Sequence, residues 1–198
     1  MIVYGDINSG NCYKVKLLLT LLGIEHQWQH VDIIAGETKS DNFLSINPSG
    51  KIPVVVFDDG KTLTESNAIL SYFAKDTEYL PNDRFLNAKV YQWMFFEQYS
   101  HEPFVAVARF IKRYLGLPDD RKAQYESLQE GGNKALQTIE IQLENNQYLV
   151  TEQLTIADIA LYAYTHVADE GGFDLNNYPN TQAWCKRISE TDGYVSMC

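Results

Sequence analysis

A short segment, residues 47–66, restricts the fold more than any other part of this chain. Pro53 opens the apolar run Val54-Val55-Val56-Phe57, and a proline at the start of a strand has no N–H to give to a neighbouring strand. The pair Asp59-Gly60 is typical of a tight hairpin turn, because these residue types accept positive φ angles. A short return strand then leads into a helix that starts near Glu65. The segment therefore predicts a hairpin followed directly by a helix.

The same segment has the features of a binding site for a small peptide that carries a carboxylate. The backbone of Ile52, just before Pro53, is expected at an edge, where it can pair with an extended ligand. The helix start at Glu65-Ser66 presents unpaired N–H groups and the positive end of the helix dipole, and both attract anions. One segment thus offers a strand edge for a peptide backbone and a pocket for its carboxylate.

Composition excludes several classes of partner. The chain has 198 residues, 45% of them apolar, which is ample for a folded core. Its 16 basic and 26 acidic residues give a net charge of −10, which disfavours nucleic acid and anionic lipid. The apolar run from Val15 to Leu22 is interrupted by Lys16 and is too short to cross a bilayer. We therefore expect neither a nucleic-acid partner nor a membrane span.

The cysteines and histidines indicate reduced thiols and no metal site. Cys12, Cys185 and Cys198 are an odd and scattered set, which does not suit a disulfide framework. The four histidines show no ligand spacing with them. The first residues lead directly into a strand without a charged leader, so we expect a cytoplasmic protein.

The first 75 residues alternate strand and helix signals. We expect strands at 2–4, 28–33, 54–57 and 61–64, and helices at 13–22, 40–46 and 65–74. The resulting order, β-α-β-α-β-β-α, is a thioredoxin-like α/β pattern whose right-handed crossover makes the first two strands parallel. This predicts a first domain at residues 1–75.

The sequence after residue 75 is predicted to form a linker and then a helical domain. Residues 76–85 contain Pro81-Asn82-Asp83 and little periodicity, which predicts a linker. From 86 to 198, apolar residues recur at three- and four-residue steps, which predicts an all-α second domain. Gly131-Gly132 marks an expected weak spot or bend within one long helix.

One helix of this second part has an explicit start. Thr155 precedes it and Asp158 follows three positions later, which is the pattern of a capping box. Asp158 could be a catalytic acid, but a buried cap explains the spacing better.

Taken together, these features resemble the cytosolic glutathione transferases over essentially the whole chain. The resemblance rests on the pair Ile52-Pro53, on Glu65-Ser66 and on the capping box at Thr155, in this order and spacing. It implies a cis bond before Pro53, glutathione as co-substrate without any further cofactor, a small hydrophobic electrophile and a homodimer.

The resemblance also assigns roles by position. It implies that the Ile52 backbone pairs with the cysteinyl part of glutathione, next to Pro53. Glu65 and Ser66 would hold the γ-glutamyl end. Two lysines, Lys39 and Lys51, lie where related classes contact the glycine carboxylate, although both could equally be solvated surface charges.

The chemical centre is expected at Ser9-Gly10-Asn11-Cys12, where the first strand meets the first helix. Ser9 stands where thioredoxins carry the first cysteine of Cys-x-x-Cys, so the protein lacks that dithiol. Ser9 matches an activating serine of phi-like classes, and Ser9-x-Asn11 resembles the Thr-x-Asn pattern of the bacterial nu class. Cys12 has two readings, as an alternative reactive thiol or as a small apolar residue packed beneath the helix.

The second substrate is the least defined part of the prediction. Phe104 and Arg109 are candidates for an electrophile pocket in the helical domain. The leading function is transfer of the glutathione thiolate to a small electrophile, as in detoxification. The alternatives are glutathione-dependent disulfide or peroxide reduction, and a non-catalytic glutathione- or ligand-binding protein.

Overall fold

The computed structural model describes residues 1–197, which divide into two compact units. The first unit comprises Met1–Lys75 together with the described residues from Asp192 on, and the second comprises Asp76–Thr191. Cys198 lies outside the described residues.

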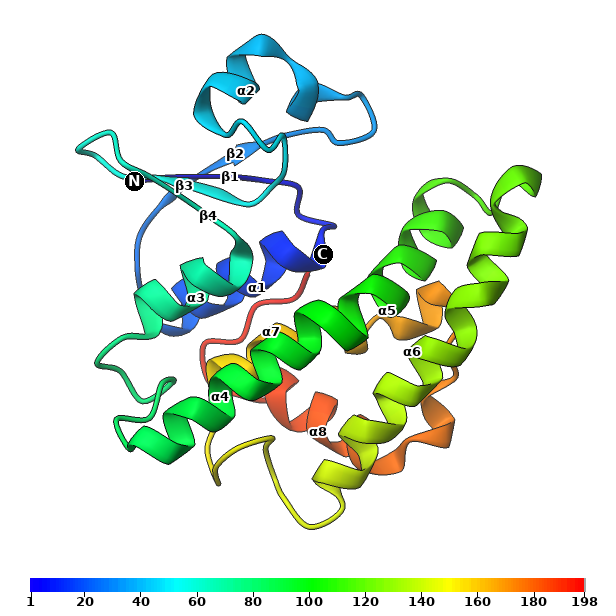
Figure 1. Ribbon diagram of the computed structural model, residues 1–198. Coiled ribbons are helices and arrows are strands. Elements are labelled where there is room, and N and C mark those ends of the chain that lie inside the picture. Colours follow the sequence, from blue (N-terminus) through cyan, green and yellow to red (C-terminus); the bar gives the residue numbers. More distant parts are fainter. Residues whose placement is uncertain (198) are drawn as a thin grey trace. The chain divides into compact units, whose positions relative to one another are not determined.

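The first unit is built around a four-stranded mixed sheet (Figure 1). Its elements are β1 (Ile2–Gly5), α1 (Gly10–Leu21), β2 (Gln27–His30), the 3-10 helix η1 (Glu37–Lys39), α2 (Asp41–Ile46), β3 (Val54–Val56), β4 (Thr62–Thr64) and α3 (Ser66–Ala74). The strand order is β2-β1-β3-β4, with β1 parallel to β2 and antiparallel to β3, and β3 antiparallel to β4. The predicted α/β order, including the parallel first pair and the hairpin, is confirmed.

The two faces of this sheet carry different helices. Val3 and Val55 pack on the face that α1 and α3 cover. Because side chains alternate along a strand, the neighbouring residues Tyr4 and Val54 lie on the opposite face, in one cluster with Phe43 of α2. Figure 1 shows α1 and α3 on one side of the sheet and α2 on the other.

Strand β2 is shorter than the sequence predicts. We expected a strand over residues 28–33, but β2 ends at His30. The Asp32 carboxylate accepts hydrogen bonds from the backbone N–H groups of Ile34 and Ala35, at 2.8 Å and 2.9 Å. An Asp side chain that binds amides two and three residues ahead stabilises a turn, so the chain leaves the sheet here.

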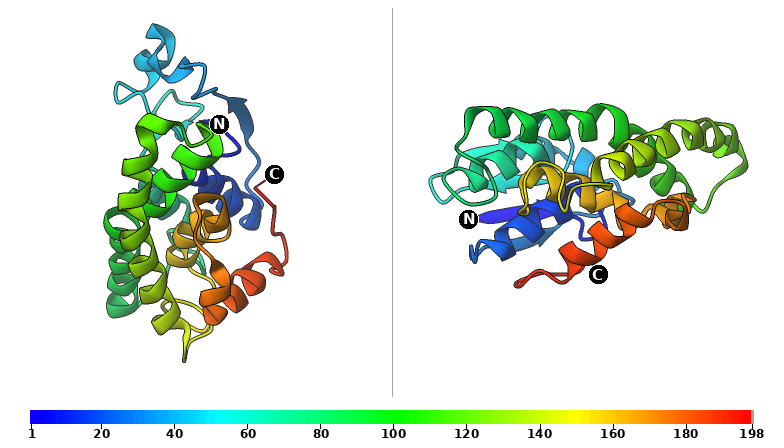
Figure 2. Two further views of the ribbon diagram at one scale, coloured as in Figure 1. Left: turned by 90° about the vertical axis from the view of Figure 1, so that its right-hand side faces the viewer. Right: turned by 90° about the horizontal axis from the view of Figure 1, so that it is seen from below.

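The second unit is helical. Its elements are α4 (Arg84–Phe96), the π-helical segment η2 (Glu97–His101), α5 (Glu102–Arg109), the π-helical segment η3 (Phe110–Tyr114), the 3-10 helix η4 (Asp119–Arg121), α6 (Lys122–Leu143), α7 (Ile156–Thr165), the 3-10 helices η5 (Ala168–Gly171) and η6 (Leu175–Asn177), and α8 (Pro179–Ser189). The views in Figures 1 and 2 agree that α5 and α6 run side by side. Helix α7 is buried along its whole length.

The glycine pair does not interrupt α6, and it has a packing role that the sequence did not predict. Helix α6 is continuous through Gly131 and Gly132. A Cβ on Gly131 would overlap the ring of Phe104, and a Cβ on Gly132 would overlap the ring of Phe173. The two glycines therefore allow the rings of Phe104 and Phe173 to lie directly against the backbone of α6. This close packing accounts for the glycine pair without a flexible spot in the helix.

The end of the chain differs from the expected domain division. Residues from Asp192 on belong to the first unit, whereas we assigned everything from 86 to 198 to the helical domain. The Tyr13 hydroxyl of α1 donates a hydrogen bond to the Val195 carbonyl at 2.8 Å, and Met197 is buried. Residues 190–197 contain no long apolar repeat, so the sequence alone carried no signal for this contact.

The capping box at the start of α7 is present as predicted. Asp158 is fully buried, and its carboxylate accepts hydrogen bonds from the Thr155 N–H and hydroxyl at 2.9 Å and 2.8 Å. It also accepts from the Leu149 N–H at 2.8 Å and from the Trp184 indole N–H at 3.0 Å. Asp158 therefore joins α7 to the preceding loop and to α8, and its role is structural.

Candidate functional site

Ser9 stands at the junction of β1 and α1. Its backbone is extended, its N–H donates to the Asp6 carbonyl at 3.0 Å, and its own carbonyl accepts from Cys12 and Tyr13 at 3.1 Å and 2.8 Å. The Ser9 side chain makes no capping hydrogen bond to the helix amides. Its hydroxyl instead hydrogen-bonds the Cys12 thiol. The backbone thus begins the helix, and the hydroxyl is not needed to cap it.

Cys12 is packed rather than accessible. Its side chain is fully buried, and its sulfur lies so close to Gly5 that a Cβ there would be only 3.0 Å away. Burial raises the pKa of the Cys12 thiol to about 12, although the Ser9 hydrogen bond acts in the opposite direction. Because only a thiolate is a good nucleophile, these facts favour the packing interpretation of Cys12 over a reactive thiol.

Two residues predicted for the site meet between α1 and α3. The Ser66 hydroxyl, in the first turn of α3, donates a hydrogen bond to the side-chain oxygen of Asn11 at 3.2 Å. Ser66 is 5% exposed, and Glu65 before it has a φ of 65°, a left-handed conformation that is uncommon for a residue other than glycine. The starts of both helices therefore lie next to each other.

Lys14 and Asn67 extend this link, and both were missed as site residues by sequence reasoning. Lys14 of α1 is fully buried, and its ammonium donates a hydrogen bond to the Asn67 side-chain oxygen at 3.2 Å. Lys14 follows Asn11 by three residues on α1, so both face the same helix, as that spacing requires. The sequence feature that could have identified Lys14 is its position within the apolar run of α1. A buried cation between two helix starts adds to the attraction for anions there.

The loop before β3 holds the predicted cis proline. The Ile52–Pro53 bond is cis, as the resemblance implied. The ladder of β3 begins at Val54, so the Ile52 backbone lies outside the sheet. The Asn47 amide donates to the Lys51 carbonyl at 2.7 Å, and the Asn47 side-chain oxygen accepts from Ser49. Asn47 therefore supports the loop from within.

Lys39 reaches the same loop from η1. Its ammonium donates a hydrogen bond to the Gly50 carbonyl at 3.2 Å. Gly50 has a φ of 60°, and a Cβ there would lie 2.8 Å from the Lys39 nitrogen and 2.9 Å from the Thr38 carbonyl, so only glycine fits. Both Lys39 and Lys51 are exposed. Lys39 thus lies against the loop before Ile52.

The two residues expected for the electrophile lie in the second unit, in different surroundings. Phe104 lines an open groove of about 490 Å³ between α5 and α6, together with Gly131. The Arg109 guanidinium forms a 2.7 Å ion pair with Glu170, and its side chain is 4% exposed. Sequence reasoning placed both in one pocket, and the structure does not bring them together in this groove.

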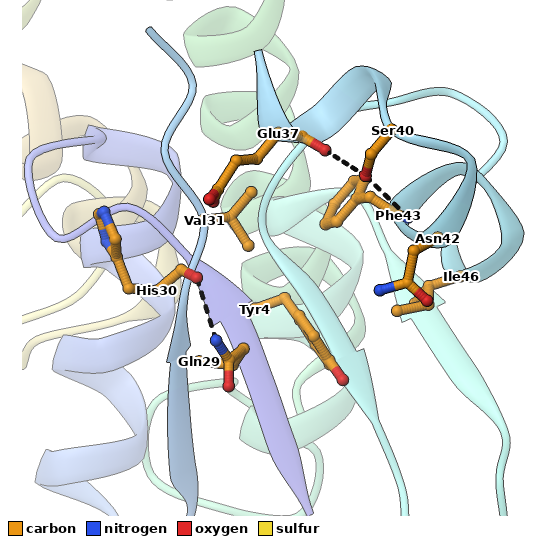
Figure 3. Close-up of a pocket in the computed structure, with 9 residues that line it drawn as sticks. All are labelled: Tyr4, Gln29, His30, Val31, Glu37, Ser40, Asn42, Phe43 and Ile46. Atoms are coloured by element: carbon orange, nitrogen blue, oxygen red, sulfur yellow. Dashed lines mark hydrogen bonds between the residues drawn. The ribbon is translucent and has the colours of Figure 1, made fainter. Parts of the chain in front are cut away.

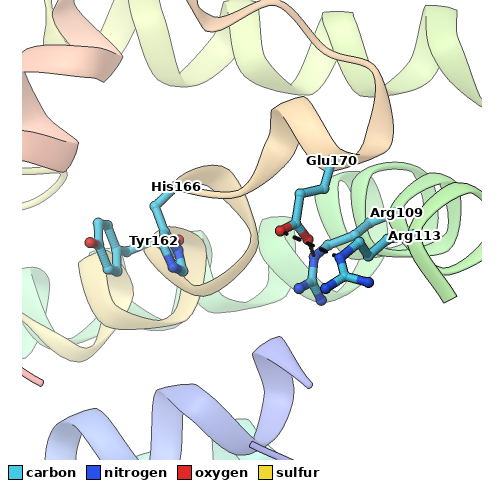
Figure 4. A network of polar contacts seen from close by, with 5 residues as sticks. All are labelled: Arg109, Arg113, Tyr162, His166 and Glu170. Carbon is cyan, nitrogen blue, oxygen red and sulfur yellow. Dashed lines mark hydrogen bonds and ion pairs between the residues drawn. The ribbon is translucent and has the colours of Figure 1, made fainter. Parts of the chain in front are cut away.

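Figure 4 shows the polar network around Arg109. Arg113 lies one turn further and approaches Glu170 at 3.8 Å, so two guanidinium groups share one carboxylate. The His166 ring stacks on Tyr162 with centroids 4.4 Å apart, and burial lowers the pKa of His166. Arg109 is buried, whereas its partner Glu170 is 31% exposed, so the pair fixes the Arg109 side chain within its own unit.

Two properties of residues 1–197 concern metal ions and membranes. No group of three or more His, Cys, Asp or Glu side chains in this range is arranged to hold a metal ion. None of the helices in this range combines the length and apolar character needed to cross a bilayer.

Comparison with known proteins identifies the family. Residues 8–76 match the model of the glutathione S-transferase N-terminal domain, and residues 90–192 match that of the glutathione S-transferase C-terminal domain. Among curated proteins, elongation factor 1-gamma of Artemia salina is 36% identical over 83% of this chain, and the match spans 40% of that relative's own length.

Solved structures agree with the family models over nearly the full chain. A glutathione S-transferase from Pseudomonas fluorescens Pf-5 is 56% identical with a TM-score of 0.97, and the match covers 99% of this chain and 98% of that one. A maleylacetoacetate isomerase from Methylobacterium extorquens AM1, solved with malonate and glutathione bound, is 26% identical with a TM-score of 0.83 over 98% and 94% of the two chains. The chain belongs to the glutathione S-transferase family.

Proposed function

We propose that this protein binds glutathione in its first unit, stabilises the thiolate and transfers it to a small hydrophobic electrophile, without a metal or a further cofactor. The observation that carries the proposal is the hydrogen bond between Ser66 and Asn11, which joins the starts of α1 and α3. The same unit carries the cis bond before Pro53 and the backbone of Ile52 outside the sheet.

In the proposed complex, each part of glutathione meets a group of matching chemistry. The Ile52 backbone pairs with the cysteinyl residue, because its peptide groups lie outside the ladder. Ser66 and the amides at the start of α3, with Glu65, hold the γ-glutamyl end, where the helix dipole favours its carboxylate. Lys39 and Lys51 flank the loop on the side that would receive the glycine carboxylate.

Activation of the glutathione thiol needs only a moderate free energy. A thiol with a pKa near 8.5 becomes half ionised at pH 7 after a shift of roughly 1.5 units, which is about 2 kcal/mol. A hydrogen bond to a charged acceptor contributes about 1.5–3 kcal/mol, so one hydroxyl is sufficient. We assign this role to Ser9, whose hydroxyl can rotate from Cys12 to the ligand sulfur, with Asn11 in support.

On the electrophile side, we propose Phe104 as an apolar contact, because its ring lines an open groove. We assign Arg109 a supporting role, since its charge is paired with Glu170 inside the helical unit.

The decisive test compares wild type with Ser9→Ala in conjugation of glutathione to an aryl halide across a range of pH. We expect Ser9→Ala to lower kcat/KM by about tenfold to a hundredfold near neutral pH and to raise the kinetic pKa by about 1–2 units. Cys12→Ala is the matched control, and we expect it to keep the wild-type pH profile. Unchanged rates in Ser9→Ala would refute the serine role.

The same assays separate the alternatives. Hydroperoxide and glutathionyl disulfide substrates report the reductase function, which the pattern Ser9-x-Asn11 suggested. If no substrate turns over while glutathione still raises the melting temperature, the protein is a binding module. If glutathione gives no thermal shift at millimolar concentration, the site assignment itself is wrong.

We also propose that the protein is a homodimer. Three large apolar side chains on one face of α4 and η2 are strongly exposed, Phe85 and Phe95 at 71% and Tyr99 at 85%. Exposed aromatic residues clustered on one helix face are typical of interfaces between subunits. Light scattering should give twice the chain mass for wild type and the monomer mass for Phe95→Glu, and a monomeric wild type would contradict this proposal.

We propose a cytoplasmic location, supported by the two cysteines within residues 1–197. Cys12 and Cys185 are both free thiols, and burial raises the pKa of each. Thiols that stay unpaired are typical of a reducing compartment. Cell fractionation with antibody detection would test this location, and recovery from an extracytoplasmic fraction would refute it.

A further inference from the structure

The first unit has a second pocket, on the sheet face opposite α1 and α3. It has a volume of about 530 Å³ and lies between β1, β2 and the segment from η1 to α2 (Figure 3). Its lining residues are Tyr4, Gln29, His30, Val31, Glu37, Ser40, Asn42, Phe43 and Ile46. None of them belongs to the proposed glutathione set. A pocket of this volume suits a small organic molecule.

The pocket has an apolar base made of aromatic and branched side chains. Val31 and Phe43 are buried at 4% exposure and form one cluster with Tyr4 and Ile46. The rings of Tyr4 and Phe43 meet edge to face, with centroids 6.4 Å apart. This base suits a flat or aliphatic body, and an aromatic face also attracts a cation.

The electrostatics of the pocket favour a positive ligand. Of its nine lining residues, Glu37 alone carries a formal charge when histidine is neutral, and no lysine or arginine lines it. One Glu37 carboxylate oxygen accepts from the Asp32 N–H at 2.7 Å, which orients the group. The nearest ammonium along the chain, that of Lys39, is directed to the Gly50 carbonyl. The carboxylate of Glu37 is therefore not neutralised by a cation from the pocket wall.

Polar side chains around the hollow have unused hydrogen-bonding capacity. Within residues 1–197, neither the Tyr4 hydroxyl nor the Asn42 side-chain amide makes a hydrogen bond to the protein. Ser40, by contrast, is fully engaged, since its hydroxyl donates to the Glu37 carbonyl and accepts from the Phe43 N–H. In Figure 3 the Glu37 carboxylate lies beside Val31, whereas the Asn42 amide and the Tyr4 hydroxyl lie toward the other end of the pocket.

We propose that this pocket binds a small primary amine with an aryl or alkyl body. The ammonium donates to the Glu37 carboxylate, and the apolar body lies against Val31 and Phe43. An ammonium is matched by this acceptor, whereas an anion would face the Glu37 charge directly. The two sets share no residue, and the segment η1 contributes Glu37 to this pocket and Lys39 to the proposed glutathione set.

The test uses 2-phenylethylamine as probe, titrated into the full-length protein and followed by backbone amide NMR shifts. We expect saturable shifts at Tyr4, His30 and Asn42 with a dissociation constant on the order of 1 mM, as a fragment of this size allows. The neutral isostere 2-phenylethanol should bind about tenfold more weakly, and phenylacetate should not bind, because each lacks the charge-assisted hydrogen bond.

Amino-acid substitutions test whether the Glu37 carboxylate is the group that recognises the ammonium. Glu37→Gln keeps an oxygen for the Asp32 N–H, so the fold should persist, and it should weaken amine binding about tenfold. The matched control is Glu25→Gln, the same change at an exposed residue of this unit that does not line the pocket, and it should leave binding unchanged. Asn42→Arg, at an exposed position, should abolish amine binding by adding a positive charge.

Three outcomes would overturn the proposal. The first is no saturable shift at the pocket residues. The second is equal affinity for the amine and the alcohol, and the third is unchanged amine binding in both Glu37→Gln and Asn42→Arg. Repeating the titration on Ser9→Ala separates this site from the proposed transferase function, since loss of turnover there should leave amine binding intact.

Discussion

Asp158 allows the sharpest estimate of what a single side chain contributes to this fold. Its buried carboxylate accepts four hydrogen bonds, from the Leu149 N–H, the Trp184 indole, and the N–H and hydroxyl of Thr155. Asp158→Ala leaves three donors that cannot turn away, and each buried unsatisfied donor costs about 1–3 kcal/mol. Because such costs add incompletely, we expect a loss of about 4–5 kcal/mol in the free energy of unfolding.

Asp158→Asn should cost less, for a reason that the geometry supplies. The new amide group can face the Thr155 hydroxyl, which can rotate to accept, so the Thr155 N–H is the one fixed donor that loses its partner. That donor, together with the lost negative charge on the acceptor, predicts a cost of about 2–3 kcal/mol. Burial raises the pKa of Asp158, while the hydrogen bonds from Leu149, Trp184 and Thr155 lower it, which fits a group held by its partners rather than by water.

Urea unfolding followed by tryptophan fluorescence measures these costs, because Trp184 contacts the carboxylate directly. The matched control is Asp83→Asn, which changes an N-cap that accepts from Phe85 and Leu86 but is exposed to water. Asn and Asp are nearly equivalent as N-caps, so this control should stay within about 0.5 kcal/mol of wild type. A loss below about 1 kcal/mol for Asp158→Ala would refute the hydrogen-bond accounting.

Two further predictions follow from the first unit. Its Cys12 thiol keeps a proton in the folded state until about pH 12, whereas the unfolded thiol loses it near pH 9.0, so stability falls as pH rises above 9.0. From pH 7 to pH 10, wild type should therefore lose about 1.4 kcal/mol more than Cys12→Ala in urea unfolding, and equal losses would contradict the burial of this thiol. Ser66→Ala removes the bond to Asn11, and calorimetry should show glutathione binding weakened by about tenfold. Ser71→Ala, on the same helix, should bind as wild type does, and an equal effect of both variants would contradict a specific role of Ser66.

The sequence could predict the parts of this molecule that local chemistry specifies. The hairpin follows from Pro53 and Asp59-Gly60, and the start of α7 follows from the spacing of Thr155 and Asp158, because each depends on residues within a few positions. The meeting of Ser66 with Asn11 could be expected only through the resemblance to a family, since these residues are 55 positions apart.

Other features could not be predicted, because they depend on what a side chain meets after folding. By residue type Lys14 is expected to be a solvated charge, but it is buried and α3 places the Asn67 side-chain oxygen within hydrogen-bond distance of it. Gly131 reads as a helix weakness, yet Phe104 occupies the space that a Cβ would need. The π-helical segments η2 and η3 flank α5, and the three- and four-residue apolar steps of the sequence indicate helix without distinguishing π-helical from α-helical turns.

The two faces of the sheet in the first unit have opposite electrostatic character, and this follows from strand alternation. On the face of Val3, the starts of α1 and α3 direct their amides and the buried ammonium of Lys14 toward one region, which favours anions such as the carboxylates of glutathione. On the face of Tyr4, the chain turns through acidic residues, and the Glu37 carboxylate lines the pocket without a cation beside it. Of the adjacent β1 residues, Val3 is buried in the core that α1 and α3 cover, whereas Tyr4 lines the pocket on the opposite face. We therefore propose that this one α/β unit offers an anionic co-substrate a site at its helix starts and a cationic ligand a site on the opposite sheet face, with no residue common to both.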